Sequence, residues 1–404
     1  MFRRPAVSAA TWIGGNPPLR SPAFSEKPGF CSAETRERGV VVSRHSDRRD
    51  RLRRLLRSAA ADDLLVTHPA NVTYLTGFTG DSSYLLLMPR DEVMISDGRY
   101  AQQLAEECPD LSTEIRRPGV EILPMVAQVV GAVKLRTLAI EAASMTVAFL
   151  GELSKQLPQV EIVPTSSLVE GLREIKDRDE ITQIRQAIDL AERAFAVVRA
   201  GLRPDCTEKQ VAHELERQIR LFGGAGCSFT PIVGVGPRGA LPHARLSDHR
   251  VEESDIVLID WGARGELYVS DLTRVLVTAK ISPKLERVYG VVLKAQEAAI
   301  SSIRPGAVLK EIDAAARNVI SDAGFGKFFT HGLGHGIGLE IHEGPRFAPN
   351  QERQLKAGMV VTVEPGIYLP QWGGVRIEDD VLVTRTGCEV LSHVAKELGD
   401  CVVP

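Results

Sequence analysis

The chain has 404 residues, and its 49 Lys and Arg against 52 Asp and Glu leave a formal net charge of −3. This balance argues against a nucleic-acid binder, and 44% hydrophobic with 25% charged residues is the composition of an ordinary soluble protein. No stretch approaches the roughly 18 to 20 consecutive apolar residues that a membrane-spanning helix needs. We therefore expect a soluble protein of two or three domains that binds neither nucleic acid nor membrane.

Residues 1–45 mix Pro, Gly, Ser and Arg without periodicity and lack the apolar core of a secretory signal. We interpret them as a disordered extension, with a transit peptide or a misassigned start codon as alternatives. The cysteines are scattered, without a C-x-x-C pair or a histidine partner at zinc-finger spacing. They are typical of free thiols in a reducing compartment, so we expect a cytoplasmic protein.

Residues 46–168 alternate between helical and strand-like segments. A basic helical run begins at Asp47 and leads into the short apolar segment Leu64–Val66. Further apolar runs are Tyr84–Met88, Val93–Ile95 and Leu138–Ile140, and the helical stretches between them are Tyr100–Glu107 and Met125–Val133. Strands that alternate with helices predict a small α/β domain, which ends near Ser167.

Residues 169–404 form the second predicted domain. An amphipathic pattern over Leu168–Ala200 predicts one long helix at the domain junction, broken only by the charged stretch Lys176–Glu180. The helix ends before Arg203-Pro204, and a second helix follows over about Thr207–Leu221. A glycine-rich loop comes after it.

The same order of elements recurs about a hundred residues later, which indicates an internal repeat. A helix over Glu286–Ile303 ends in Arg304-Pro305, and another helix starts near Val308. Each copy continues with two β-runs that hold one acid each: Asp260 and Asp271 in the first copy, Glu364 and Glu378 in the second. We infer a pseudo-two-fold duplicated α-α-β-β unit whose halves each contribute two acids to one site.

These acids predict a metal centre. Strand alternation places residues i and i+2 on one face, so Thr362 and Glu364 point together, as do Arg376 and Glu378. Buried carboxylates that converge repel one another and need cations, and two divalent metal ions would supply them. Oxygen-rich ligation favours a hard ion such as Mn²⁺, although the general affinity order favours zinc. The alternative interpretation is a set of unrelated surface acids at hairpin ends.

The segment His331–Leu339 is the second feature that indicates a metal site. Its histidines at 331 and 335 have zinc-protease spacing, but the glycines between and after them disfavour a helix. In an extended strand both histidines share one face, and His335 would add a nitrogen ligand to the acids. His342 follows, and His243 lies in the first half. We interpret the other histidines as structural: His45, His68, His213, His249 and His393.

The segment Gly234–Gly239 matches the G-x-G-x-x-G expression of dinucleotide-binding sites. Pro237 and Pro242 prevent the helix that must open at such a site. A G-x-S-x-G elbow and a Walker A loop are both missing from the sequence. We therefore reject a nucleotide-binding interpretation.

Taken together, the motifs resemble those of the M24-type metallopeptidases, which have the pita-bread fold and include methionine aminopeptidases, Xaa-Pro aminopeptidases and Xaa-Pro dipeptidases. The resemblance runs from about Asp47 to Val403. The motifs that carry it are Ile259–Gly262, Ser270–Arg274, His331–Glu343, Val363–Tyr368 and Gly373–Asp379. It implies an α/β protein in which a creatinase-like N-terminal domain precedes a pita-bread catalytic domain.

The resemblance also implies a site with two divalent metal ions, Mn²⁺ by preference and Co²⁺, Zn²⁺ or Fe²⁺ as alternatives. The implied ligands are Asp260, Asp271, His335, Glu364 and Glu378, with Asp271 and Glu378 bridging. His243 and His342 would flank the substrate, polarise its carbonyl group and help to move protons. Arg376 would lie beside a bridging acid, and Glu364 would also carry a proton.

The implied reaction is the attack of a metal-bound hydroxide on the peptide bond that precedes proline. The N-terminal domain favours the proline-directed branch over methionine aminopeptidases. We expect an Xaa-Pro aminopeptidase, compatible with a homodimer, that acts on peptides with a free N-terminus and proline in second position. An Xaa-Pro dipeptidase is the alternative. A catalytically dead module that binds a peptide or another partner is a remote one, because all the implied ligands are present.

Overall fold

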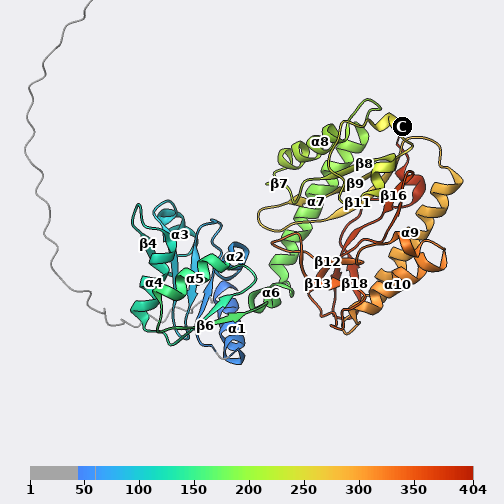
Figure 1. Ribbon diagram of the computed structural model, residues 1–404. Helices are drawn as coiled ribbons and strands as arrows, with labels where there is room; N and C mark the ends of the chain where they lie inside the picture. The colour runs from blue at the N-terminus through green and yellow to red at the C-terminus, as the bar shows by residue number, and fades with distance from the viewer. Residues whose placement is uncertain (1–43, 60, 404) are drawn as a thin grey trace, which may run out of the picture. The chain divides into compact units, whose positions relative to one another are not determined.

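The computed structural model describes residues 44–59 and 61–403 (Figure 1). The extension predicted over 1–45 lies outside them, apart from Arg44 and His45, which begin α1 (Arg44–Ser58). None of the described helices is long and apolar enough to cross a bilayer. The cysteines within the described residues are free, and Cys31 lies outside them.

The N-terminal domain is built around a mixed sheet with the strand order β4-β3-β2-β1-β5-β6. Its strands are β1 (Leu64–Val66), β2 (Tyr84–Leu87), β3 (Glu92–Asp97), β4 (Ser112–Arg116), β5 (Thr137–Glu141) and β6 (Glu161–Thr165). Its helices are α1, α2 (Pro69–Thr76), α3 (Ala101–Glu107), α4 (Ile122–Val133) and α5 (Val147–Gln156). β1 lies antiparallel to β2 and parallel to β5, so hairpin and crossover connections meet at the centre of the sheet.

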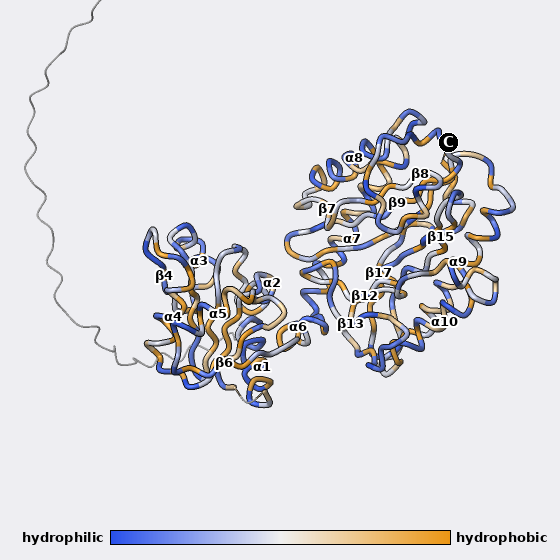
Figure 2. The backbone as a smooth tube through the Cα atoms, viewed as in Figure 1, coloured by the Kyte–Doolittle hydropathy of each residue, from blue (hydrophilic) through white to orange (hydrophobic). Residues whose placement is uncertain are grey.

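Helices cover both faces of this sheet because its central strands are apolar on both sides. Leu65 and Ile140 pack into a cluster with residues of α4 and α5. Their chain neighbours Leu64 and Ala139 point to the opposite face and pack with α1 and α2. Because both faces of the sheet are covered, the sequences of its central strands are continuous apolar runs and do not alternate between apolar and polar residues. Figure 2 shows hydrophobic residues along these strands.

The junction between the domains holds two helices. The long helix predicted over Leu168–Ala200, with a break at the charged stretch Lys176–Glu180, consists of α6 (Leu168–Arg173) and α7 (Arg178–Ala200). The Asp177 carboxylate accepts the Glu180 N–H at 2.9 Å, and the Glu180 carboxylate accepts the Asp177 N–H at 2.8 Å. This reciprocal capping box starts a new helix at the charged stretch, so the stretch separates two helices.

The second domain has the duplicated order that the sequence predicted. The first half contains α7, α8 (Glu208–Leu221), β7 (Gly226–Cys227), β8 (Ile232–Val235), η1 (Gly236–Ala240), η2 (Val251–Glu253), β9 (Ile256–Trp261), β10 (Ala263–Arg264) and β11 (Leu272–Val277). The second half contains α9 (Pro283–Ser302), α10 (Leu309–Asp322), η3 (Gly326–Phe328), β12 (Gly334–Gly336), β13 (Glu343–Phe347), β14 (Val360–Val363), β15 (Gly366–Leu369), β16 (Gly373–Arg376), β17 (Asp379–Val383), β18 (Cys388–Val390) and η4 (Leu398–Cys401). In each half a pair of helices precedes the strands whose ends carry the predicted acids.

The strands of the two halves form separate sheets that meet at the acids. One has the order β11-β9-β8 and another β13-β12-β14-β17-β18, with the pairs β15-β16 and β10-β7 beside them. An isolated β-bridge between Thr273 and Glu378 joins the halves. In Figure 1, α7 and α8 flank these strands on one side and α9 and α10 on the other. The acids therefore lie between the two helix pairs.

Each helix pair is held by its own apolar core. Phe195 of α7 and Leu215 of α8 pack with Trp261 of β9, and the Phe195 and Trp261 rings stack with centroids 4.1 Å apart. Val292 of α9 packs with Val361 of β14 in the corresponding core of the second half. Burial of these aromatic and branched side chains supports the strands from behind, so the strand ends are held in place around the acids.

The glycine motif Gly234–Gly239 does not begin an α-helix. Gly234 lies in β8, and the remainder of the motif forms η1, a short 3₁₀ helix with Pro237 in its first turn. A dinucleotide site needs the N-terminus of a longer helix at this point. The motif therefore lacks the helix on which a dinucleotide site of this kind depends.

Candidate metal centre

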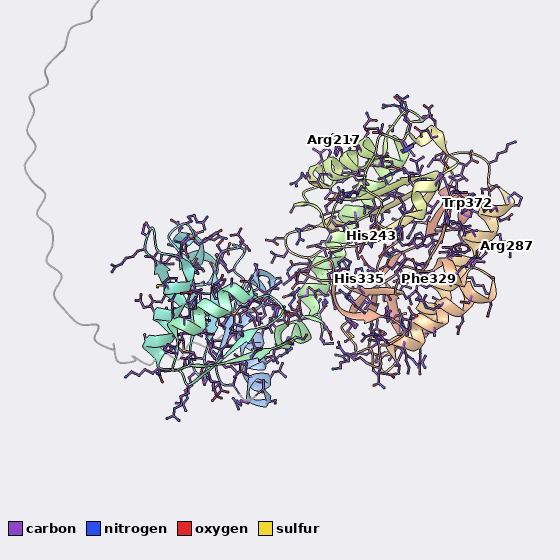
Figure 3. All side chains as sticks on the ribbon, viewed as in Figure 1. Arg217, His243, Arg287, Phe329, His335 and Trp372 are labelled. Carbon is purple, nitrogen blue, oxygen red and sulfur yellow. The ribbon has the colours of Figure 1, made fainter. Side chains whose placement is uncertain are left out.

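The predicted site residues line one cavity of about 920 Å³ in the second domain. They are His243, Asp260, Asp271, His335, His342, Glu364, Arg376 and Glu378. Figure 3 labels His243 and His335, which come from the first and the second half of the domain. The volume is that of a site for a small ligand.

Each acid stands at or next to a strand end. Asp260 lies near the end of β9, Asp271 directly precedes β11, Glu364 directly follows β14, and Glu378 lies between β16 and β17. Asp260, Asp271 and Glu378 are only 8%, 5% and 1% exposed. The duplicated strands thus bring acids from both halves into one buried cluster.

His335 faces this cluster from β12. Its Nε2 atom lies 3.6 Å from Asp271 Oδ2 and 3.5 Å from Glu364 Oε1. One ligand atom each of Asp271, His335 and Glu378 lies within 4.8 Å of the others. Burial lowers the pKa of His335 to about 4, and its Nδ1 atom lies 3.0 Å from the Gly336 carbonyl oxygen. A proton on Nδ1 would donate to that carbonyl and leave the Nε2 lone pair for a cation.

Burial and mutual repulsion dominate the electrostatics of the acids. Burial first, and then Glu378, Asp260 and Glu364, raise the pKa of Asp271 well above its usual value. Burial also raises the pKa of Glu364 to about 8, although the positive charge of Arg376 opposes the shift. The cluster therefore holds more negative charge than its surroundings neutralise.

Arg376 contacts the cluster at one acid. Its Nη2 donates to Asp260 Oδ2 at 2.5 Å, its Nε to the Thr273 hydroxyl at 3.0 Å, and its Nη1 to the Tyr368 hydroxyl at 2.8 Å. The other Asp260 oxygen, Oδ1, is buried and accepts no hydrogen bond from an N–H or a hydroxyl of the described residues. Arg376 thus orients Asp260 and leaves one of its oxygens free to act as a ligand.

This donor set fits divalent cations. Crowded, buried carboxylates with raised pKa values, an Asp260 oxygen that accepts no N–H or hydroxyl within the described part of the chain, and a neutral imidazole together supply oxygen ligands and one nitrogen ligand. Hard and borderline divalent ions accept such ligands. A cation would also remove the repulsion that makes the cluster costly without one.

Histidines surround the centre. The His342 and His335 rings lie 4.4 Å apart between centroids at 66°, and burial lowers the pKa of His342. His331, which the sequence analysis placed in the glycine segment without a role, also lines the cavity. Its Nε2 lies 2.8 Å from the Tyr368 hydroxyl, which accepts from Arg376. A chain of polar contacts therefore connects the cavity wall to Asp260.

Some site residues carried no predicted role. Thr273 donates its hydroxyl to Glu378 Oε2 at 2.6 Å. Thr362, which strand alternation already placed beside Glu364, donates to Glu364 Oε1 at 3.3 Å and accepts the His335 N–H at 3.0 Å. Arg346 lies in β13 opposite His335 of β12, a position that only the strand register reveals.

Comparison with known proteins gives matches over both domains. Residues 48–175 match the family model described as Creatinase/Prolidase N-terminal domain, and residues 182–385 match Metallopeptidase family M24. An Xaa-Pro dipeptidase from Pyrococcus horikoshii is 34% identical over 337 residues, which are 83% of this chain and 94% of that protein.

Solved structures agree with these matches. An Xaa-Pro dipeptidase from Bacillus anthracis has a TM-score of 0.84 at 37% identity, over 88% of this chain and 99% of that one. An X-Pro aminopeptidase from Thermotoga maritima MSB8 has a TM-score of 0.80 at 35% identity, with the same coverage of 88% and 99%. The similarity thus extends over almost the whole length of these relatives.

Proposed function

This chain belongs to metallopeptidase family M24, and from this membership we propose that it is an Xaa-Pro dipeptidase, which cleaves dipeptides with proline in second position. The sequence analysis favoured an Xaa-Pro aminopeptidase and kept the dipeptidase as the alternative. The relatives from P. horikoshii and B. anthracis bear the name Xaa-Pro dipeptidase, and they support the alternative better. The T. maritima relative keeps the aminopeptidase as the second candidate.

One observation about the cavity favours the dipeptidase over the aminopeptidase. Arg245 and Arg346 line it together with the acids. Within the described residues, neither guanidinium takes part in an ion pair or a hydrogen bond. Burial is the main cause that lowers the pKa of His335 and of His342, and the charge of Arg346 adds to it at both histidines. A dipeptide bears its carboxylate one residue beyond the scissile bond, where a nearby guanidinium recognises it by a charge-assisted, bidentate contact. A longer peptide has an uncharged amide at that place.

We assign the metal ligands by the same proposal. Asp260, Asp271, His335, Glu364 and Glu378 would hold two divalent cations. When bound, the cations supply positive charge that neutralises the acids, favours ionisation of water and polarises a carbonyl group. Mn²⁺ is the ion we propose, because oxygen ligands outnumber the single nitrogen ligand.

The protein side chains orient the substrate and move its protons. Glu364, whose Oε1 is held by the Thr362 hydroxyl, takes the proton of the attacking water and passes it to the proline nitrogen that leaves. His342 and His243 stand at the cavity wall and donate to the oxygen of the tetrahedral intermediate. Proline has no N–H in the peptide bond, so shape holds its ring, and Phe229, Ile341 and Phe347 provide apolar wall for it.

The test compares three substrates of one series on the Mn²⁺-loaded enzyme: Met-Pro, Met-Pro-amide and Met-Pro-Ala. We expect Met-Pro to be preferred in kcat/KM. Arg346→Gln should lower kcat/KM for Met-Pro by about 10- to 100-fold, the size of one charged hydrogen bond, and should hardly affect Met-Pro-amide. Arg217→Gln, on the exposed face of α8, is the matched control.

The outcomes separate the candidate functions. Preferred cleavage of Met-Pro-Ala, with no effect of Arg346→Gln on any substrate, would favour the aminopeptidase. Binding of all the peptides without release of methionine would favour the binding module. Only a carboxylate-dependent loss in the Arg346 variant supports the dipeptidase.

A further inference from the structure

The loop between β12 and β13, which bears His342, is folded around the buried carboxylate of Glu343. Glu343, with a side chain only 5% exposed, accepts the backbone N–H of Leu339 at 2.8 Å and that of Glu340 at 3.2 Å, both on Oε1. The end of the loop is thereby tied to its beginning. Because His342 directly precedes Glu343, these hydrogen bonds hold the backbone from which the imidazole enters the cavity.

Two cations from the domain junction neutralise this carboxylate. Arg173, the last residue of α6, donates from Nη2 to Glu343 Oε1 at 2.6 Å and to Glu340 Oε2 at 2.8 Å. Lys176 donates from Nζ to Glu343 Oε2 at 3.1 Å. The Arg173 and Lys176 side chains are 2% and 1% exposed. Although burial acts to raise the pKa of Glu343, Lys176 and Arg173 hold it below its usual value.

A second set of contacts joins Arg173 to the N-terminal domain. Arg173 Nη1 donates to the side-chain oxygen of Asn71 in α2 at 2.8 Å. The Asn71 amide donates to Glu141 Oε1 at 2.6 Å, and Glu141 Oε2 accepts the backbone N–H of His68 at 2.8 Å. Asn71 is fully buried and Glu141 is 7% exposed. A continuous polar chain therefore runs from the N-terminal sheet through Asn71 and Arg173 to Glu343.

We propose that Asn71 and Arg173 are positioning residues for His342, so that the N-terminal domain sets the geometry of the loop that presents this imidazole to the substrate. The inference rests on the proposed function, which gives His342 its part in the reaction. Arg173 binds both loop acids and Asn71 at once through its planar fork, which a lysine ammonium cannot reproduce. None of the proposed metal ligands lies in the loop, so loss of the fork displaces His342 and leaves the metal centre intact.

The kinetic test uses Arg173→Lys and Asn71→Ala in the full-length, Mn²⁺-loaded enzyme with Met-Pro as substrate. We expect kcat to fall by about 10- to 100-fold, as for residues that orient a functional side chain, with metal content unchanged. In a His342→Ala background, Arg173→Lys should lower kcat no further, because the residue acts through the imidazole. Equal losses in both backgrounds, or an unchanged kcat, would overturn the proposal.

The matched control is Arg49→Lys. Arg49 is equally buried, with a side chain 2% exposed, and it pairs with Glu92 and Asp110 inside the N-terminal domain. We expect this variant to lower Tm as Arg173→Lys does, without a change in kcat. Any loss of kcat that merely follows lower stability will therefore be seen in both variants.

A second readout needs no activity. In the metal-free protein, amide hydrogen exchange over residues 339–343 should accelerate in Arg173→Lys and stay unchanged in Arg49→Lys. Unchanged exchange in Arg173→Lys contradicts the proposal whatever the kinetics. If the wild-type enzyme cleaves no Xaa-Pro peptide while exchange behaves as expected, the proposed function fails and the structural link between Asn71, Arg173 and the loop stands.

Discussion

Asp271 combines the properties that make a buried acid costly without a cation beside it and that suit its carboxylate to bind one. It is 5% exposed, and burial together with neighbouring acids raises its pKa well above its usual value. Above a pH of about 4, where the unfolded chain ionises freely, such an acid destabilises the metal-free fold. A divalent cation reverses this effect, because it replaces repulsion by attraction.

We predict that Asp271→Asn and His335→Ala each lower metal content and reduce turnover of Met-Pro by more than about 100-fold, beyond the effect of changing a residue that only orients a ligand. Metal analysis and steady-state kinetics measure both effects. The metal-free Asp271→Asn protein should also have a higher Tm than metal-free wild type, because folding no longer opposes the ionisation of a carboxyl group at this position. His213→Ala, on the exposed face of α8, is the control. A near-normal rate in either variant contradicts the ligand assignment.

At the scale of elements, β12 depends on close approach between backbones. A Cβ atom added to Gly334 would lie 2.2 Å from the Thr362 carbonyl oxygen of β14. A backbone oxygen within a sheet cannot move aside as the end of a flexible side chain can. The glycine before His335 therefore lets β12 sit deep enough for the imidazole to reach the acids.

Replacement of Gly334 by alanine should destabilise the protein by about 1 to 3 kcal/mol through this overpacking, and should displace His335 so that metal content and kcat fall. Gly290→Ala in α9 is the matched control, because a Cβ at Gly290 meets no atom within 4 Å. There alanine should stabilise the helix by about 0.5 to 1 kcal/mol. Denaturant unfolding measures both changes, and equal signs for the two variants would refute the packing argument.

At the scale of the whole molecule, the acid cluster makes stability depend on pH and, under the proposed ligand assignment, on metal. Burial raises the pKa of Glu364 to about 8 and those of Asp271 and Glu378 well above their usual values in the metal-free protein. A carboxyl group whose pKa is raised by folding stabilises the fold while protonated, and its ionisation costs stability as pH rises from the unfolded pKa, about 4, to the folded one. The cost of the metal-free cluster therefore rises from about pH 4 to pH 8 and does not fall again at higher pH.

Removal of metal by a chelator should lower Tm most at pH 8, and the gap between loaded and metal-free protein should narrow toward pH 5, because protons and cations compete for the same oxygens. At a free metal concentration 100 times Kd, loading adds about 2.7 kcal/mol to the free energy of unfolding. Calorimetry with and without chelator at pH 5, 6.5 and 8 measures the gap. A gap that widens as pH falls would show that these acids do not bind the metal, and Asp271→Asn should abolish most of it.

Local pattern was enough to predict the α/β class, the duplicated α-α-β-β unit and the acids at strand ends. Apolar runs mark strands, and alternation along a strand decides which side chains share a face, so Thr362 and Glu364 were placed together without coordinates. Local pattern marked a break at Lys176–Glu180, where a helical repeat continues on both sides, but it did not show that two separately capped helices form there. The reciprocal bonds of Asp177 and Glu180 divide the segment there, and the pattern of apolar residues does not reveal which caps form.

By itself, the amino-acid sequence determined which residues could serve as ligands and that two similar halves would supply them. Only the tertiary structure decided the contacts that shape the site: Arg346 opposite His335, the Thr273 hydroxyl on Glu378, and Asn71 linked through Arg173 to the His342 loop. Each joins separate segments of the chain. Strand register and the packing of one domain on the other set such contacts, and neither is encoded in the periodicity of any single segment.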